Sequence, residues 1–264
     1  MIKAFLKRLK KPKVTVVRLQ GMIAASGRGV LSDAALRDTI EKAFAAKPQA
    51  VALQINSPGG SPVQSALIAA RIRRLAQKDD IPVLAFVEDV AASGGYWLAC
   101  AADEIYADRA SVVGSIGVIS AGFGMPELLN KMGIERRVYT AGESKSTLDP
   151  FREENPQDVE RLKSLLEDVH DEFKSYVRSR RGSRLAEDDS LFTGAFWTAA
   201  RGKGLGLVDG FGDLDHVLRE KFGDKVKIKH ISQKTPFLAK LGFGAMDAAM
   251  GKIEERALFS RFGV

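Results

Sequence analysis

The uncharged stretch Val90-Ala-Ala-Ser-Gly-Gly-Tyr-Trp-Leu-Ala-Cys-Ala-Ala102 decides the fold, and it follows closely on a run typical of a buried strand, residues 81–87. A serine between small residues, where a strand meets an apolar helix, can be held on a sharp turn with its hydroxyl exposed and the next amide directed along the helix axis. The spacing Ala-x-Ser-x-Gly around Ser93 approximates the hydrolase motif Gly-x-Ser-x-Gly. Ser93 is therefore a candidate nucleophile, and an ordinary helix N-cap is the alternative.

Strands and helices alternate on either side of this stretch. Their order predicts an α/β fold with connections on both sides of the sheets. We expect strands over 14–19, 49–55, 81–87, 104–106, 134–140 and 225–231, and helices over 34–46, 62–77 and 155–181, with two short helices between 190 and 222. The helix over 155–181 carries apolar residues at alternating spacings of three and four, which predicts a core contact or a subunit interface.

Two further segments are rich in turn residues. Asn56-Ser-Pro-Gly-Gly-Ser61 joins the second strand to a helix, and its adjacent glycines permit backbone conformations in which amides face a ligand. An ordinary turn is the alternative. Residues 141–151 contain a lysine, Lys145, flanked by two serines.

A serine needs a base to remove its proton. The three histidines, His170, His216 and His230, lie in helical or strand patterns and not in turns, so a histidine triad is weakly supported. Lysine is the other known base, and Lys145 is the candidate. A lysine with its free pKa of about 10.4 is protonated at neutral pH, so Lys145 must be desolvated to act. Glu143 would favour the charged amine, and we expect its side chain to point away from Lys145.

Four motifs follow one another along the chain: Asn56-Ser-Pro-Gly-Gly60, Ala92-Ser-Gly-Gly-Tyr96, Gly114-Ser-Ile-Gly-Val118 and Gly142-Glu-Ser-Lys-Ser146 with Asp149-Pro150-Phe151. In this order they resemble the signal peptide peptidase A family, serine peptidases of the ClpP/crotonase-type fold. The resemblance runs from about residue 14 to residue 231.

This resemblance implies an α/β superhelix of strand-strand-helix units with a long amphipathic helix. It matches Ser93 to the nucleophile, Lys145 to the general base and Ser115 to the serine that orients the lysine, and it places Gly60 and Gly94 at the oxyanion hole. No metal or cofactor is required. Family members are often larger or carry a membrane anchor, and they assemble into rings. We therefore expect a homo-oligomer that cleaves unfolded or apolar peptides, signal-peptide remnants among them.

Charge and composition limit the classes of function and partner that remain. Six of the seven net positive charges lie in residues 1–13, so the rest of the chain is close to neutral and provides no basic patch for nucleic acid. The basic leader 1–13 has an apolar stripe that is suited to binding an anionic membrane surface. The alternative is that these residues are a frayed and solvated end of the chain. The single cysteine, Cys100, fits a reducing compartment and core packing.

These features predict a leader over 1–13, a peptidase domain over 14–231 and an amphipathic tail over 232–264. The leader lacks the pattern of a signal peptide and no run is long enough to span a membrane, which predicts a cytoplasmic protein with a peripheral membrane contact as an option. Two other functions stay open: an acyl-CoA-processing crotonase-like enzyme, which would leave Lys145 unexplained, and a catalytically inactive membrane-surface scaffold. Reaction with a fluorophosphonate separates them, because only an activated serine is labelled.

Overall fold

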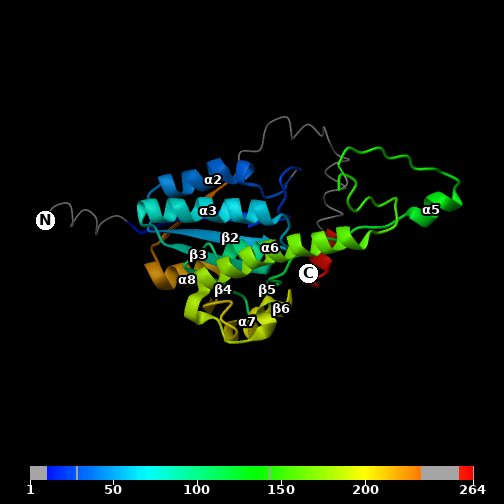
Figure 1. Cartoon of the computed structure of the whole chain (residues 1–264). Coiled ribbons are helices and arrows are strands. Elements are labelled where there is room, and N and C mark those ends of the chain that lie inside the picture. The colour runs from blue at the N-terminus through cyan, green and yellow to red at the C-terminus, as the bar shows by residue number, and fades with distance from the viewer. Residues whose placement is uncertain (1–10, 28, 143, 233–255, 264) are drawn as a thin grey trace. The chain divides into compact units, whose positions relative to one another are not determined.

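A computed structural model describes residues 11–27, 29–142, 144–232 and 256–263 (Figure 1). The chain divides into two compact units. Unit 1 takes its residues from Met1–Ile116 and Lys174–Val264, and unit 2 is Gly117–Phe173. The expected leader lies almost entirely outside the described residues, and the expected tail is described only over 256–263.

Unit 1 is built on a sheet whose centre is formed by three parallel strands. β1 (Lys13–Gln20), β2 (Ala50–Ser57) and β3 (Val83–Ala92) are runs of apolar and β-branched residues buried on both faces, as parallel strands with helices on each side require. β8 (Lys227–Ile231) adds to the outer side of β1. The strand order is β6-β5-β3-β2-β1-β8, which confirms the expected α/β class with a mainly parallel sheet.

β3 forks the sheet and ends at the candidate nucleophile. Its first half pairs with β4 (Glu104–Ala107), which continues to β7 (Gly210–Phe211), and its second half pairs with β5 (Val112–Gly114). β6 (Phe196–Thr198) pairs antiparallel with β5 and forms the edge. The sequence predicted the end of this strand at residue 87, and that bound is wrong, because residues 90–92 find a second partner strand in β5.

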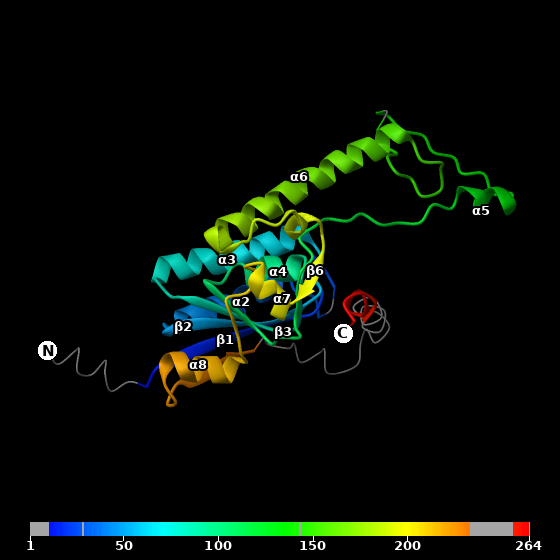
Figure 2. The ribbon, with the colours of Figure 1, turned by 90° about the horizontal axis from the view of Figure 1, so that it is seen from below.

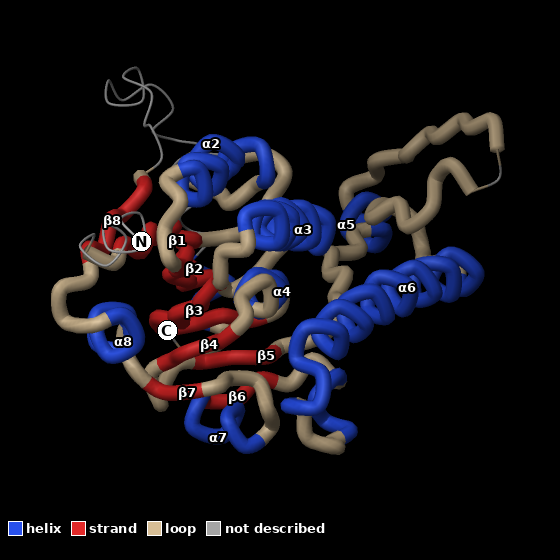
Figure 3. The backbone as a smooth tube through the Cα atoms, turned by 90° about the vertical axis from the view of Figure 1, so that its left-hand side faces the viewer, coloured by secondary structure: helices blue, strands red, loops and turns tan. Residues whose placement is uncertain are grey.

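Helices cover both faces of the central strands (Figures 2 and 3). α2 (Asp33–Ala45) and α3 (Pro62–Asp79) lie on one face, where the Thr15 hydroxyl donates to the Ala43 carbonyl at 3.1 Å. α8 (Leu214–Phe222) packs on the other face, against alternate residues of β1, β2 and β3. α7 (Ala199–Gly204) follows β6, and α4 (Gly94–Ala99) follows β3.

Unit 2 contains α5 (Pro126–Lys131) and the first part of α6 (Pro156–Arg181), whose last turns belong to unit 1. Short 3-10 turns, η1 (Gly182–Arg184) and η2 (Asp189–Phe192), follow α6. The strand predicted over 134–140 is wrong: these residues form no strand, since the described part of unit 2 has no other strand to pair with. None of the helices that the structure describes is both long enough and apolar enough to cross a bilayer.

Candidate active site

Ser93 occupies the turn between β3 and α4. Its backbone has φ 51° and ψ −123°, a conformation that costs a non-glycine residue about 1–3 kcal/mol. The Ser93 amide donates to the Gly114 carbonyl at 2.8 Å, and the Ser93 carbonyl accepts from Tyr96 and Trp97 at 2.9 and 3.0 Å. β5 and the first turn of α4 thus fix the turn from two sides.

The N-cap alternative for Ser93 is confirmed in position but not in its hydrogen bond. Ser93 stands at the N-cap position of α4, but its side chain makes no capping hydrogen bond. Its half-buried hydroxyl is therefore not used to end the helix. A backbone strained in this way, with a side chain that does not cap, is typical of a serine held for chemistry.

Gly59 lies directly against Ser93. It has φ 101°, and a Cβ at this position would be 2.8 Å from three atoms: the Ala92 carbonyl oxygen, the Gly94 nitrogen and the Ser93 Cβ. Only glycine allows the loop after β2 to approach Ser93 this closely.

The amides of Gly60 and Gly94 lie near each other beside the turn. A Cβ on Gly94 would be 3.4 Å from the Gly60 nitrogen and 2.4 Å from the Ser65 Oγ. Gly94 begins α4, so its amide has no acceptor within that helix. Among the described residues, neither the Gly60 nor the Gly94 amide donates a backbone hydrogen bond. Two such donors beside a serine have the character of an oxyanion hole.

The loop that carries these glycines is tied to its surroundings by side chains that sequence reasoning did not single out. Asn56 Nδ2 donates to Asp89 Oδ2 at 2.6 Å, and Asn56 Oδ1 accepts from the Val90 amide at 3.3 Å. Ser57 Oγ donates to the Gly21 carbonyl at 2.7 Å and accepts from the Gly59 amide at 3.2 Å. Asn56 and Ser57 belong to the turn motif, but their role as anchors depends on residues distant in sequence.

Ser115 follows β5 as Ser93 follows β3. Ala92 and Gly114 are paired across the two strands, so both serines come directly after facing residues. Ser115 also has a positive φ, 54°, and its amide donates to the Ala195 carbonyl at 2.7 Å. The structure therefore brings Ser93, Ser115, Gly60 and Gly94 to one end of the sheet in unit 1.

His230 lies at the opposite end of the sheet from Ser93. His230 on β8 pairs with Val16 on β1, which pairs with Ala52 on β2, which in turn pairs with Leu84 on β3. Leu84 lies nine residues before Ser93. At about 3.3 Å per residue this places the two about 30 Å apart along the strand direction. His216 lies near the start of α8, a helix that packs against the same early part of β3. Neither histidine of unit 1 is placed to act on Ser93.

α4, the helix that begins directly after Ser93, is anchored by hydrogen bonds to residues far along the chain. The Tyr96 hydroxyl donates to the Leu207 carbonyl at 2.9 Å, and burial raises the pKa of Tyr96 well above its usual value. Arg180 Nε donates to the Cys100 carbonyl at 2.9 Å. Burial also raises the pKa of the Cys100 thiol to about 12, which fits the expected packing role and excludes a thiolate nucleophile at neutral pH.

Lys145 belongs to unit 2, where its side chain is exposed and its amide donates to the Gly142 carbonyl at 3.2 Å. Glu143, which we expect to point away from Lys145, lies outside the described residues. The two residues of the expected dyad, Ser93 and Lys145, thus belong to different units.

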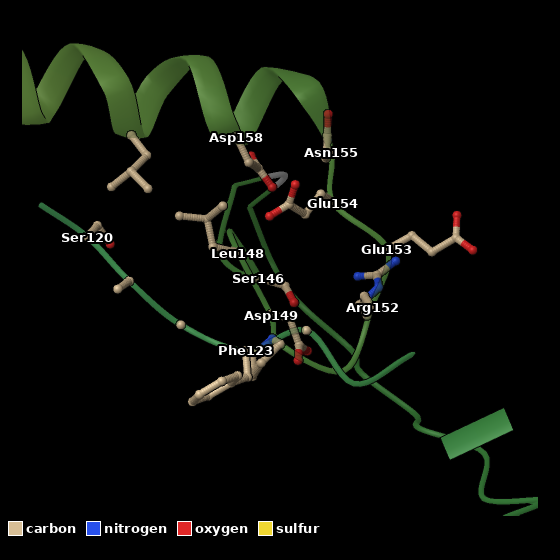
Figure 4. A pocket seen from close by; sticks show the side chains of 15 residues that line it. Ser120, Phe123, Ser146, Leu148, Asp149, Arg152, Glu153, Glu154, Asn155 and Asp158 are labelled. Atoms are coloured by element: carbon tan, nitrogen blue, oxygen red, sulfur yellow. The ribbon is translucent and has the colours of Figure 1, made fainter. Parts of the chain in front are cut away.

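A hollow of about 670 Å³ lies within unit 2, next to the Lys145 segment (Figure 4). Its lining is mostly polar and carries four carboxylates, those of Asp149, Glu153, Glu154 and Asp158. Asp149 is ion-paired with Arg136 at 2.9 Å. Desolvation raises the pKa of the Asp149 carboxyl, but the hydrogen bonds from the Phe151 amide and from Arg136 outweigh it, so the pKa is lowered. Among the described residues, no group of three or more histidine, cysteine, aspartate or glutamate side chains is arranged to hold a metal ion.

Unit 2 leaves many apolar side chains uncovered. Of the twelve large hydrophobic residues that are exposed in the described part of the chain, nine belong to unit 2: Ile119, Phe123, Leu128, Met132, Ile134, Val138, Tyr139, Leu148 and Leu165. Phe123 and Tyr139 are 87% and 89% exposed. Exposed apolar side chains, where they adjoin one another, are typical of a surface that binds another molecule.

Comparison with known proteins identifies relatives along nearly the whole chain. The Na(+)/H(+) antiporter NhaA of Brucella abortus (strain 2308) is 47% identical over 277 residues, which cover 97% of this chain and 38% of that protein. The chain therefore spans about two-fifths of the length of this relative. The probable protease SohB of Haemophilus influenzae is 33% identical over 248 residues, covering 92% of this chain and 68% of that protein.

Among solved structures, a membrane protease specific for a stomatin homolog from Pyrococcus horikoshii aligns with a TM-score of 0.46 and 16% identity, over 88% of this chain and 98% of that one. Residues 75–228 match the model of Peptidase family S49, and they include Ser93, Ser115 and Lys145. Because this match covers more than half of the chain, and the SohB likeness extends over most of both proteins, the chain belongs to peptidase family S49.

Proposed function

We propose that this chain is a serine peptidase in which Ser93 is the nucleophile and Lys145 the general base. The observation that carries the proposal is the Ser93 turn, with its strained backbone next to the amides of Gly60 and Gly94. Membership of a peptidase family supports peptide-bond hydrolysis as the reaction class.

In the proposed mechanism the neutral Lys145 amine accepts the Ser93 proton while Ser93 Oγ attacks the peptide carbonyl. The Gly60 and Gly94 amides stabilise the oxyanion, and Ser115 orients the Lys145 amine by a hydrogen bond. Lys145 then gives the proton to the leaving amine, and an ester joins the acyl group to Ser93. Water, deprotonated by Lys145, cleaves the ester, and the proton returns to Ser93.

The exposed Lys145 requires a covering surface for this role. A lysine becomes a base at neutral pH when burial destabilises its charged form. The nine exposed hydrophobic residues of unit 2 supply a surface that association would bury. We therefore infer that the chain works as a homo-oligomer, a ring by the family resemblance, whose assembly removes water from Lys145.

Unfolded apolar peptides are the proposed substrates, signal-peptide remnants among them. The antiporter name of the Brucella relative belongs to a protein of which this chain matches 38%, and the peptidase family match lies within the matched part of this chain. We place the proposed peptidase in the cytoplasm, with residues 1–13 as a peripheral contact to anionic lipid.

Labelling by a fluorophosphonate, read by mass spectrometry of the modified peptide, tests the proposed dyad. The intact chain should be labelled at Ser93, and Ser93→Ala should not be labelled. Lys145→Ala should lower the labelling rate by about 10²–10⁴-fold, the usual contribution of a general base. Lys131→Ala, which removes another lysine of unit 2, should label as the intact chain does.

Mixing Ser93→Ala with Lys145→Ala protein tests whether one dyad can be assembled from two copies. Activity that returns on mixing requires an oligomer, and no return is expected when each dyad forms within one chain. Full labelling of Lys145→Ala refutes the dyad. Absence of labelling in the folded, intact chain refutes the peptidase and favours the scaffold or the acyl-CoA alternative.

A further inference from the structure

An apolar surface leads along the sheet to Ser93. Val90 and Ala92 alternate along β3 and so share one face, and Val112 is the partner of Val90 on β5. Phe196, on the edge strand β6, is the partner of Gly114, which in turn pairs with Ala92. We call these four residues, Val90, Ala92, Val112 and Phe196, the Val90 face.

The Val90 face is covered by a distant part of the same chain. Phe259 and Phe262 pack against the cluster of Val90, Ala92 and Val112. The Phe262 ring also meets Phe196 edge to face, with 5.0 Å between ring centroids and 76° between ring planes. These aromatic residues belong to the segment 256–263, which is helical over 256–260 and is coloured red beside β6 in Figure 2.

The position of this contact gives it a consequence for catalysis. Ala92 directly precedes Ser93, so the two aromatic rings lie against the strand that ends at the nucleophile. A substrate peptide that presents its carbonyl to Ser93 must place its neighbouring side chains on surfaces adjoining this strand end. An apolar substrate side chain placed on the Val90 face would therefore have to displace the rings of Phe259 and Phe262.

We propose that the segment 256–263 is an intramolecular competitor of peptide substrates for the Val90 face. The proposal rests on the proposed function, because competition requires that Ser93 be the site of attack. Since the occupant belongs to the same chain, its inhibition does not depend on protein concentration. A peptide with an aromatic or large aliphatic side chain matches the chemistry of this occupant and should displace it most effectively.

The first test compares two double variants. Phe259→Ala with Phe262→Ala removes both rings, and Arg256→Ala with Arg261→Ala changes two exposed side chains of the same segment. If the segment is docked nine-tenths of the time, removing the rings should lower KM for a phenylalanine-containing peptide about tenfold with little change in kcat. The arginine variant should behave as the intact chain. An unchanged or raised KM in the phenylalanine variant overturns the proposal, because a merely structural segment would change stability without lowering KM.

The second test detects docking without using activity. Phe196→Cys with Phe262→Cys places one thiol on each of the two residues whose rings meet, and the natural Cys100 is buried with a raised pKa and should not react. A reagent that carries two methanethiosulfonate groups on a short linker should bridge the two thiols of one chain through two disulfides, releasing one sulfinate for each, and fluorophosphonate labelling of Ser93 should fall until a reductant restores it. Failure of the bridge to form overturns the docking. A bridge between two chains overturns its intramolecular nature.

The two tests separate this proposal from the proposed function. Normal labelling of Ser93 without bridge formation refutes the competitor and leaves the peptidase intact. A bridge that forms within one chain while Ser93 is never labelled, even after reduction, refutes the peptidase and with it the competition. Labelling that is unaffected by the closed bridge refutes the competition alone.

Discussion

Replacement of Gly59 by alanine tests the geometry of the site most directly. A Cβ at Gly59 would lie 2.8 Å from the Ser93 Cβ and from the Gly94 nitrogen, whereas ordinary contact begins at 3.4 Å. Ser93 or the Gly94 amide must therefore move by about 0.6 Å, or the loop that carries Gly59 must withdraw. Displacements approaching 1 Å cost about 100-fold in rate, and loss of an oxyanion donor costs about 10²–10³-fold. We expect kcat to fall by about 100-fold or more.

Gly223→Ala is the matched control for this substitution. Gly223 has φ 86°, close to the φ of 101° at Gly59, but nothing lies within 4 Å of its added Cβ. Both alanines carry the strain of a positive φ, about 1–3 kcal/mol, and only Gly59→Ala meets the site. At about 2–4 °C per kcal/mol, Gly223→Ala should lower Tm by roughly 2–12 °C and leave kcat unchanged.

The assay is hydrolysis of a fluorogenic peptide, with Tm from circular dichroism. If Gly59→Ala folds and keeps kcat within about threefold of the intact chain, the close approach of Gly59 to Ser93 is not needed for catalysis and the reasoning fails. If Gly59→Ala unfolds at the assay temperature, the slower fluorophosphonate labelling expected of the same variant, measured at low temperature, takes its place as the test.

Three further predictions concern the scaffold of the site. Asn56→Ala removes the hydrogen bond to Asp89 and leaves the Val90 amide without its acceptor, so the free energy of unfolding, measured by urea titration, should fall by about 1–3 kcal/mol. An unchanged free energy of unfolding would show that these hydrogen bonds do not stabilise the fold. Cys100 should resist a thiol reagent at pH 8 until the chain is unfolded, and rapid reaction of the folded chain would contradict its burial and its raised pKa. The hydrogen bonds from Arg71, both 2.7 Å long, lower the pKa of Asp33 below its unfolded value of about 3.9. A carboxyl whose pKa is lowered by folding stabilises the fold above its unfolded pKa, and this stabilisation is lost as the pH falls through the folded pKa. The free energy of unfolding of Asp33→Asn should therefore fall less steeply with decreasing pH than that of the intact chain. An unchanged dependence on acid pH would show that this pair does not contribute.

Local pattern was sufficient for most elements of unit 1. The apolar runs that became β1 and β2 are continuous, as strands buried on both faces must be, and the helix bounds follow from Pro62 at the start of α3 and the spacing of apolar residues in α6. The motifs around Asn56, Ser93 and Ser115 were recognisable because turns require particular residue types, and the structure brings these three turns together. Their order along the chain was enough to predict the family, which the comparisons confirm.

The remaining features depend on contacts between residues far apart in sequence. The length of β3 could not be predicted from its own residues, because its last three residues pair with β5, and residues 134–140 look like a strand but have no partner in unit 2. Phe259 and Phe262, which cover the Val90 face, lie more than 160 residues from Val90 along the chain. A periodic pattern of apolar residues cannot predict a contact over that distance. Local sequence determines which conformations are low in free energy. The choice among them depends on the partner residues that bury an apolar face or accept a hydrogen bond, and these partners are in place only once the chain has folded.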